Sequence, residues 1–235
     1  MNLRQIGHDL VSALGLDTPP IALALADGAP AGVATFEGTV PSACTFWRRA
    51  ERGVFYATAE QHFRCPIGAM VMGFDLPAAV KDELMGLVGV MIGGRYLGAD
   101  EPERIPTLPR KAAGVVYGPL TQFPVEPDYI VLWLNPRQAM LMSEAAGANN
   151  WTVANPPGLL GRPACAAIPM SGARGATALS LGCAGMRTYT EVAEDRLLAV
   201  VPASGLASLW TALGTTLEAN SSIGAVYAAR KAGAA

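Results

Sequence analysis

The pattern of apolar and polar positions predicts short strands that alternate with helices. Apolar residues at helical spacing predict a first helix that ends near Gly15, and a C-terminal helix is expected after Pro202. Residues 129–134 form a nearly continuous apolar run, which is typical of a strand covered on both faces. Further strands are expected at residues 21–25, 54–58, 115–117, 176–181 and 197–201.

Cap and turn signals predict the internal helices. Helices are expected at residues 43–50 and 76–91, and Asn135 followed by Pro136 predicts the start of another helix that continues to Ser143. Residues 62–68 are expected to be a turn that delivers Cys65 to a helix start. The proline- and glycine-rich segment 149–161 predicts a loop over one edge.

The two halves of the chain resemble each other in this pattern. Residues 20–25 resemble 128–134, and residues 114–119 resemble 197–202. We therefore expect a mixed α/β (α+β) fold of two related strand-rich halves, with helices packed outside, a repeat compatible with internal duplication. Residues 1–235 should form one compact domain of two half-units, about 20–120 and 127–206, with N- and C-terminal helices and the site between the halves.

Composition excludes several classes of function. With 51% hydrophobic and 15% charged residues, a chain of 235 residues can bury a sizeable core. The net charge of -2 and the scattered basic residues argue against a nucleic-acid partner. The uncharged stretch 197–217 is too polar to span a membrane, and residues 1–16 carry charges that no signal-peptide core tolerates. We expect a cytoplasmic protein with no membrane partner.

The four cysteines occupy matched places in the two halves: Cys44 and Cys65 in the first, Cys165 and Cys183 in the second. Cytoplasmic thiols stay reduced, so disulfides are a poor explanation for their even number. Thiolates prefer zinc, Cu(I) or iron–sulfur clusters. A tight zinc knuckle and ferredoxin spacing are both absent, so we favour a [4Fe–4S] cluster on four dispersed cysteines and keep zinc as the alternative. Burial of the cysteines as small apolar residues is the plain alternative.

Three further features accompany the cysteines. Gly68, Gly182 and Gly185 lie next to cysteines and would let the backbone approach a bound cofactor closely. His62, three residues before Cys65, is the candidate to move a proton or to act as a metal ligand, and a hydrogen-bonded loop histidine is the alternative. Arg187 is the best candidate to orient an anionic substrate or to offset the charge of a cluster, and a surface salt bridge to Glu191 or Glu194 is the alternative.

An ordered set of motifs resembles a known family. The motifs are Cys44 with Phe46-Trp47, Tyr56-Ala-Thr-Ala-Glu60, His62-Phe-Arg-Cys65-Pro-Ile-Gly68, Asn135-Pro-Arg-Gln-Ala-Met140, Cys165, and Ser180-Leu-Gly-Cys183-Ala-Gly-Met-Arg187. From about residue 20 to residue 202, the chain resembles the domain-of-unknown-function family DUF169, uncharacterised prokaryotic proteins. The resemblance implies no activity. It marks the family's shared motif positions as Cys44, His62, Cys65, Cys165, Cys183, Gly185 and Arg187.

Three functional hypotheses follow. The first is a cytoplasmic [4Fe–4S] protein that transfers electrons to a redox partner, or that performs redox or Lewis-acid chemistry on a small molecule. The second is a metal-free enzyme with Cys65 as nucleophile and His62 as base. The third is a module, with or without structural zinc, whose apolar surfaces serve a partner or a homo-oligomer. The sequence leaves all three open.

Overall fold

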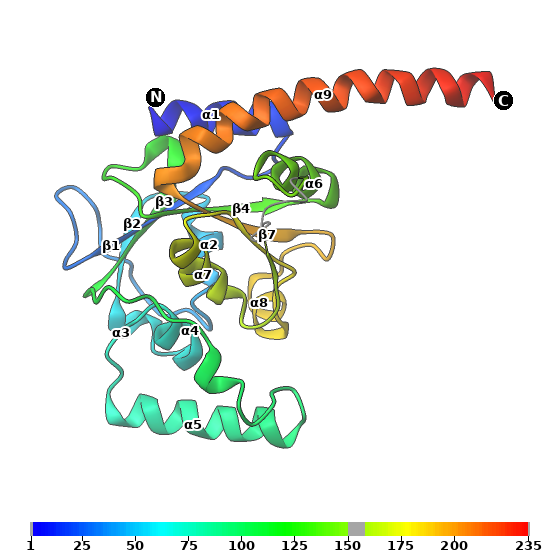
Figure 1. Ribbon diagram of the computed structural model, residues 1–235. Helices are drawn as coiled ribbons and strands as arrows, with labels where there is room; N and C mark the ends of the chain where they lie inside the picture. The colour runs from blue at the N-terminus through cyan, green and yellow to red at the C-terminus, as the bar shows by residue number, and fades with distance from the viewer. Residues whose placement is uncertain (1, 150–157, 235) are drawn as a thin grey trace.

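A single seven-stranded sheet organises the molecule (Figure 1). The computed structural model describes residues 2–149 and 158–234. Its strands are β1 (Ile21–Ala26), β2 (Phe55–Thr58), β3 (Gly114–Pro119), β4 (Tyr129–Leu134), β5 (Leu159–Leu160), β6 (Ala178–Ser180) and β7 (Leu197–Pro202). They lie in the order β2-β3-β1-β4-β7-β6-β5, and every neighbouring pair is antiparallel except β5 with β6. The predicted mixed α/β class is confirmed, with one continuous sheet.

The strand order is the same in both halves when it is followed outwards from the central β1–β4 pair. β1 pairs with β3, which pairs with β2, and β4 pairs with β7, which pairs with β6. β1 and β4 are themselves antiparallel, with Leu23 opposite Tyr129. The segments that resemble each other in sequence therefore occupy equivalent places in the sheet. A duplication of the half-unit stays a prediction.

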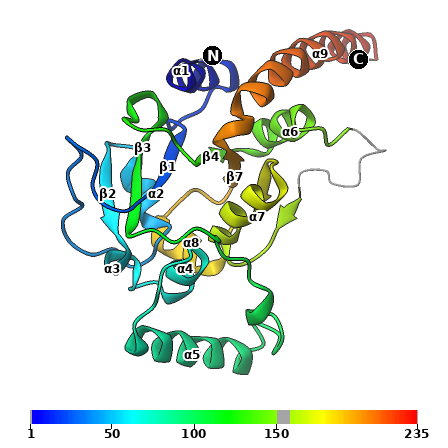
Figure 2. The same cartoon turned by 60° about the vertical axis from the view of Figure 1, so that its left-hand side comes forward.

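Helices cover both faces of the sheet. They are α1 (Leu3–Leu14), α2 (Thr45–Ala50), α3 (Ala59–His62), α4 (Pro66–Val71), α5 (Ala78–Gly93), α6 (Pro136–Ala145), α7 (Ala167–Arg174), α8 (Ala184–Thr190) and α9 (Leu206–Gly233). In Figure 1, α1, α6 and α9 lie above the sheet, whereas α2, α7, α8 and the short α3 and α4 lie below it. Helix α5 lies beyond α4, farther from the sheet, as Figure 2 also shows.

Two apolar cores result, one on each face of the sheet. Because successive side chains of a strand point to opposite faces, Leu23 joins the core below the sheet and Ala22 the core above it. In β4, Trp133 belongs to the lower core and Leu132 to the upper one. This burial on both faces explains the uninterrupted apolar run of β4.

Most of the predicted elements are present, with small shifts at their ends. Gly15 ends α1 in the left-handed conformation (φ 63°), Asn135 caps α6, and Cys65 is the residue before α4. The helices α3, α7 and α8 were not predicted. Pro169 lies in the first turn of α7, where a missing N–H breaks no helical hydrogen bond.

The predicted loop at residues 149–161 needs a partial correction. Its last part contains the short strand β5, which pairs with β6 at the edge of the sheet. Backbone groups of β6 that would otherwise be unpaired at the edge therefore have partners in β5. Residues 150–157 of that prediction lie outside the described residues.

Helix α9 is long and only partly packed. Its first half contacts the upper core through Leu206, Leu209 and Leu213, and its second half extends past the body of the molecule (Figure 1). Ile223 and Tyr227 are exposed there. Within residues 2–149 and 158–234, no helix combines the length and the apolar character needed to cross a bilayer.

Candidate functional site

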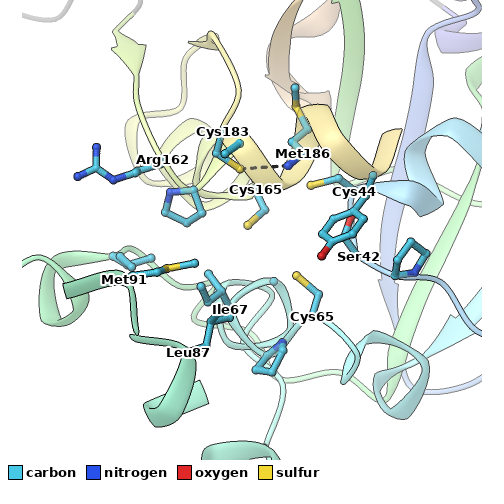
Figure 3. A pocket seen from close by; sticks show the side chains of 18 of the residues that line it. Ser42, Cys44, Cys65, Ile67, Leu87, Met91, Arg162, Cys165, Cys183 and Met186 are labelled. Carbon is cyan, nitrogen blue, oxygen red and sulfur yellow. Dashed lines mark hydrogen bonds between the residues drawn. The ribbon is translucent and has the colours of Figure 1, made fainter. Parts of the chain in front are cut away.

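The four cysteines line a single pocket on the lower face of the sheet (Figure 3). Each comes just before a helix that packs on this face: Cys44 before α2, Cys65 before α4, Cys165 in the turn before α7, and Cys183 before α8. The pocket has a volume of about 370 Å³. The fold thus brings together thiols that are far apart in sequence, two from each half.

Backbone N–H groups are directed at the sulfur atoms. The amide of Met186 donates to Cys183 Sγ at 3.4 Å. The amides of Ala43 and Gly68 donate hydrogen bonds to Cys65. They lower the pKa of its thiol and partly offset the increase that burial causes. Such donors stabilise a thiolate over a thiol, and they are a common feature around metal-bound sulfur.

Burial has the opposite effect on the pKa of the thiols, because it disfavours the charged thiolate. Cys44 and Cys165 are each 5% exposed, and burial raises the pKa of both thiols well above the ordinary value. The charges that the other cysteines would carry as thiolates raise it further. Burial also raises the pKa of Cys65. The pocket therefore favours neutral thiols until a positive centre compensates their charge on deprotonation.

The thiols enter the pocket from different sides. Among the side chains that the structure describes, no group of three or more His, Cys, Asp or Glu residues is placed to hold a single metal ion. In Figure 3, Cys44, Cys65 and Cys165 extend into the same space from different sides. The four thiols are donors of the kind that a thiolate-bound centre uses.

Two of the three predicted glycines line the pocket. A Cβ atom at Gly68 would lie 3.0 Å from Cys65 Sγ and 2.8 Å from the Cβ of Ala43, so no side chain fits there. Gly185 also lines the pocket, but a Cβ atom at this position would have its nearest neighbour 3.9 Å away, on Tyr189. Gly182 lies outside the lining and has a φ of +91°. Its role is to shape the turn that presents Cys183.

This difference gives a matched pair of substitutions. Gly182→Ala should lower the free energy of unfolding by roughly 1–3 kcal/mol, because the new methyl group meets positive φ and would collide with Met186 Cε. Gly185→Ala, three residues away in a helix with open space, should be nearly neutral or slightly stabilising. Urea unfolding of both variants measures the effect. Equal losses would contradict the assigned turn strain.

His62 does not lie at the pocket, which corrects its expected place in the site. The side chain is fully buried among Phe46, Phe74 and Tyr117. Nδ1 donates to the carbonyl oxygen of Thr58 at 2.7 Å, and Nε2 accepts from the Tyr117 hydroxyl at 2.9 Å. Both nitrogens are thus engaged in the core, and the geometry gives no support to His62 as a base or a ligand.

Arg187 is also engaged away from the pocket. Its guanidinium donates to the carbonyl oxygens of Leu181, Arg196, Ala193 and Glu194, at 2.6 to 3.4 Å. These bonds tie the turn before α8 to the loop before β7. The residue therefore positions the segment that carries Cys183, and its position does not support a direct role in binding an anion.

The pocket has a wall that the sequence did not indicate. Leu87 and Met91 of α5 face the cysteines (Figure 3), and Tyr96 and Arg162 also line the pocket. The helical pattern predicted α5 correctly, but nothing in that pattern located the helix opposite the thiols. Only the fold reveals this contact.

Comparisons with known proteins agree with the motifs. A family model, DUF169, described as uncharacterised ArCR, matches residues 9–211. No curated protein and no solved structure matches the chain. The match includes all four cysteines.

Proposed function

Because the chain belongs to the uncharacterised family DUF169, we propose its function from its own residues: Cys44, Cys65, Cys165 and Cys183 hold a [4Fe–4S] cluster. The observation that carries this proposal is the convergence of four thiols, from four helix starts, on one pocket. Four cysteine thiolates are the usual ligands of such a cluster.

The dispersal of the four cysteines along the chain favours a cluster over a single zinc ion. Structural zinc sites usually contain two cysteines that are two to four residues apart, and this chain has no such pair. A cluster with four irons spreads its ligands, because each cysteine binds a different iron. The N–H groups aimed at Cys65 and Cys183 suit sulfur atoms that carry charge.

The cluster would supply one-electron chemistry. With all four cysteines bound, its chemistry is electron transfer to and from a redox partner, in the reducing cytoplasm where free thiols persist. Burial of Cys44 and Cys165 keeps water from one side, while the half-exposed Cys65 and Cys183 face the open side. Electrons would enter and leave on that open side.

The iron content of the protein tests the proposal. Protein purified without oxygen should be brown and contain about four iron and four sulfide ions per chain. As a control, the protein is prepared in the same way with added zinc and without iron. A mononuclear site would then bind about one zinc ion per chain. A colourless preparation without iron would refute the cluster, and one zinc ion per chain in its place would establish the alternative.

A further inference from the structure

One segment of the first half has no counterpart in the second, and it covers the pocket. In the second half, α8 ends at Thr190 and β7 begins at Leu197. In the first half, α4 ends at Val71 but β3 begins only at Gly114. We call the intervening residues 72–113, which include α5, the arm. Figures 1 and 2 show α5 on the far side of α4 from the sheet.

The arm gives the pocket an apolar wall. Leu87, Met91, Leu97 and Ile105, all from the arm, line the pocket. Figure 3 shows Leu87 and Met91 across from the thiols. The charged residues of the lining are exposed and lie at its rim: Arg64, Glu83 and Arg162. The interior is thus mostly hydrocarbon and sulfur, with the buried Ser42 as a polar residue, and the charged side chains are the exposed ones.

A small set of contacts fastens the arm to the second half. The guanidinium of Arg162 lies 4.7 Å from the centroid of the Tyr96 ring and pairs with Glu101 at 2.9 Å. The Tyr96 hydroxyl accepts a hydrogen bond from the amide of Ala184 at 3.3 Å. Ala184 directly follows Cys183, so this fastening lies at the edge of the thiol pocket. Exposed contacts of these kinds are individually weak, which allows the part of the arm that carries α5 to open while Phe74 and Leu108 anchor its ends in the lower core.

We propose that the space between the arm and the thiols binds a small molecule with a compact apolar group, and that Tyr96 and Arg162 hold the arm closed over it. The volume of about 370 Å³ falls within the range of roughly 300–1,000 Å³ found for small-molecule sites. Apolar walls select a ligand by the apolar surface that it buries. The site shares the pocket with the proposed cluster but depends on the arm and not on iron.

Thiol labelling tests the chemical class of the ligand. The full-length, metal-free, reduced protein is treated with N-cyclohexylmaleimide or N-methylmaleimide, which reach the half-exposed Cys65 and Cys183. Each rate is divided by the rate with glutathione. We expect the normalised rate to be roughly ten-fold higher for the cyclohexyl reagent, because its ring is buried before reaction. A ratio near one would overturn the proposal.

Two methionines of α5 provide a matched comparison. Met91→Gln places a polar group in the wall and should lower the cyclohexyl-to-methyl ratio several-fold. Met85→Gln makes the same change on the same helix at a side chain that is 67% exposed and outside the pocket, so the ratio should not change. Equal ratios in the two variants would also overturn the proposal.

The fastening is tested with two arginines. Arg162→Gln should raise the rate with N-methylmaleimide several-fold, whereas Arg104→Gln, whose partner Asp100 lies within the arm, should not. Equal rates would refute the role of Arg162. Circular dichroism checks that the metal-free variants are folded. If they are not folded, the variants are compared in the iron-loaded form. The rate of iron removal is then measured with phenanthroline and with its charged disulfonate, and phenanthroline, the apolar chelator, should remove iron faster.

The outcomes separate the two proposals. Labelling without metal does not depend on the iron content, so an iron-free native protein leaves the ligand site standing. A labelling ratio near one in a protein that carries four irons per chain would remove the ligand site and leave the cluster.

Discussion

Substitution of Cys165 by alanine is expected to abolish iron binding and to lower the melting temperature of the anaerobic protein by at least about 10 °C. Cys165 is buried at the closed end of the pocket, and the free energy of metal binding is free energy of folding when the site forms only in the folded chain. A shift of about 10 °C corresponds to a loss of about 2.5–5 kcal/mol, since about 2–4 °C accompany each kcal/mol in a chain of this size. Iron analysis and thermal melting measure both effects.

A buried apolar residue of the same face separates metal loss from ordinary loss of packing. Val71→Ala, at a fully buried position in α4, should cost about 2 kcal/mol for the two methyl groups that are removed but should keep the iron. Full iron content in Cys165→Ala would show that this thiol is not a ligand. Equal iron loss in both variants would show that iron content merely follows stability.

His62 should make the stability of the protein sensitive to mild acid. Burial lowers the pKa of His62 from 6.5 to about 4 in the folded protein. In the unfolded chain the imidazole takes up a proton at the higher pH, so the unfolded state binds more protons between these two values. The stability is therefore complete above the unfolded pKa and declines as the pH falls towards the folded one. From about pH 7 to about pH 5 the loss from this group is about 2 kcal/mol.

The two histidines of the chain provide the control. His62→Gln replaces the imidazole by an uncharged side chain, and its free energy of unfolding in urea should lose about 2 kcal/mol less between these pH values. His8→Gln, at an exposed position of α1, should behave like the native protein. The hypothesis fails if His62→Gln keeps the full pH dependence.

The sequence predicted the parts of the fold that rest on local patterns. The run from Tyr129 to Leu134 defines β4 because a strand covered on both faces needs no polar residue. The pair Asn135 and Pro136 defines the start of α6, where the Asn135 side chain accepts from the amide of Gln138. The matched positions of the cysteines correctly led to one shared pocket, because equivalent helix starts meet on the same face of the sheet.

The features of the fold and the site that depend on contacts between distant residues could not be predicted from local patterns. His62 is held by Tyr117, 55 residues further along the chain, and nothing local distinguishes such a core histidine from a ligand next to Cys65. Arg187 donates hydrogen bonds to backbone carbonyl groups, and the sequence does not indicate such partners because every residue has a carbonyl group. Helix α5 packs against α4, and the contact of Tyr96 with Arg162 joins the arm to the second half, which only the folded chain creates.

Because the cysteines and α9 lie on opposite faces of the sheet, the site of attachment decides which face of the protein an electrode surface would contact. Helices α1 and α9 lie on the face opposite to the cysteines, and the end of α9 projects away from the body. A surface attached through α9 would leave the arm and the pocket mouth pointing into solution, accessible to small molecules. The sheet and its packed helices, spaced about 10 Å per layer, would then separate an electrode from the thiols. Attachment near α5 would reverse this and favour direct electronic contact.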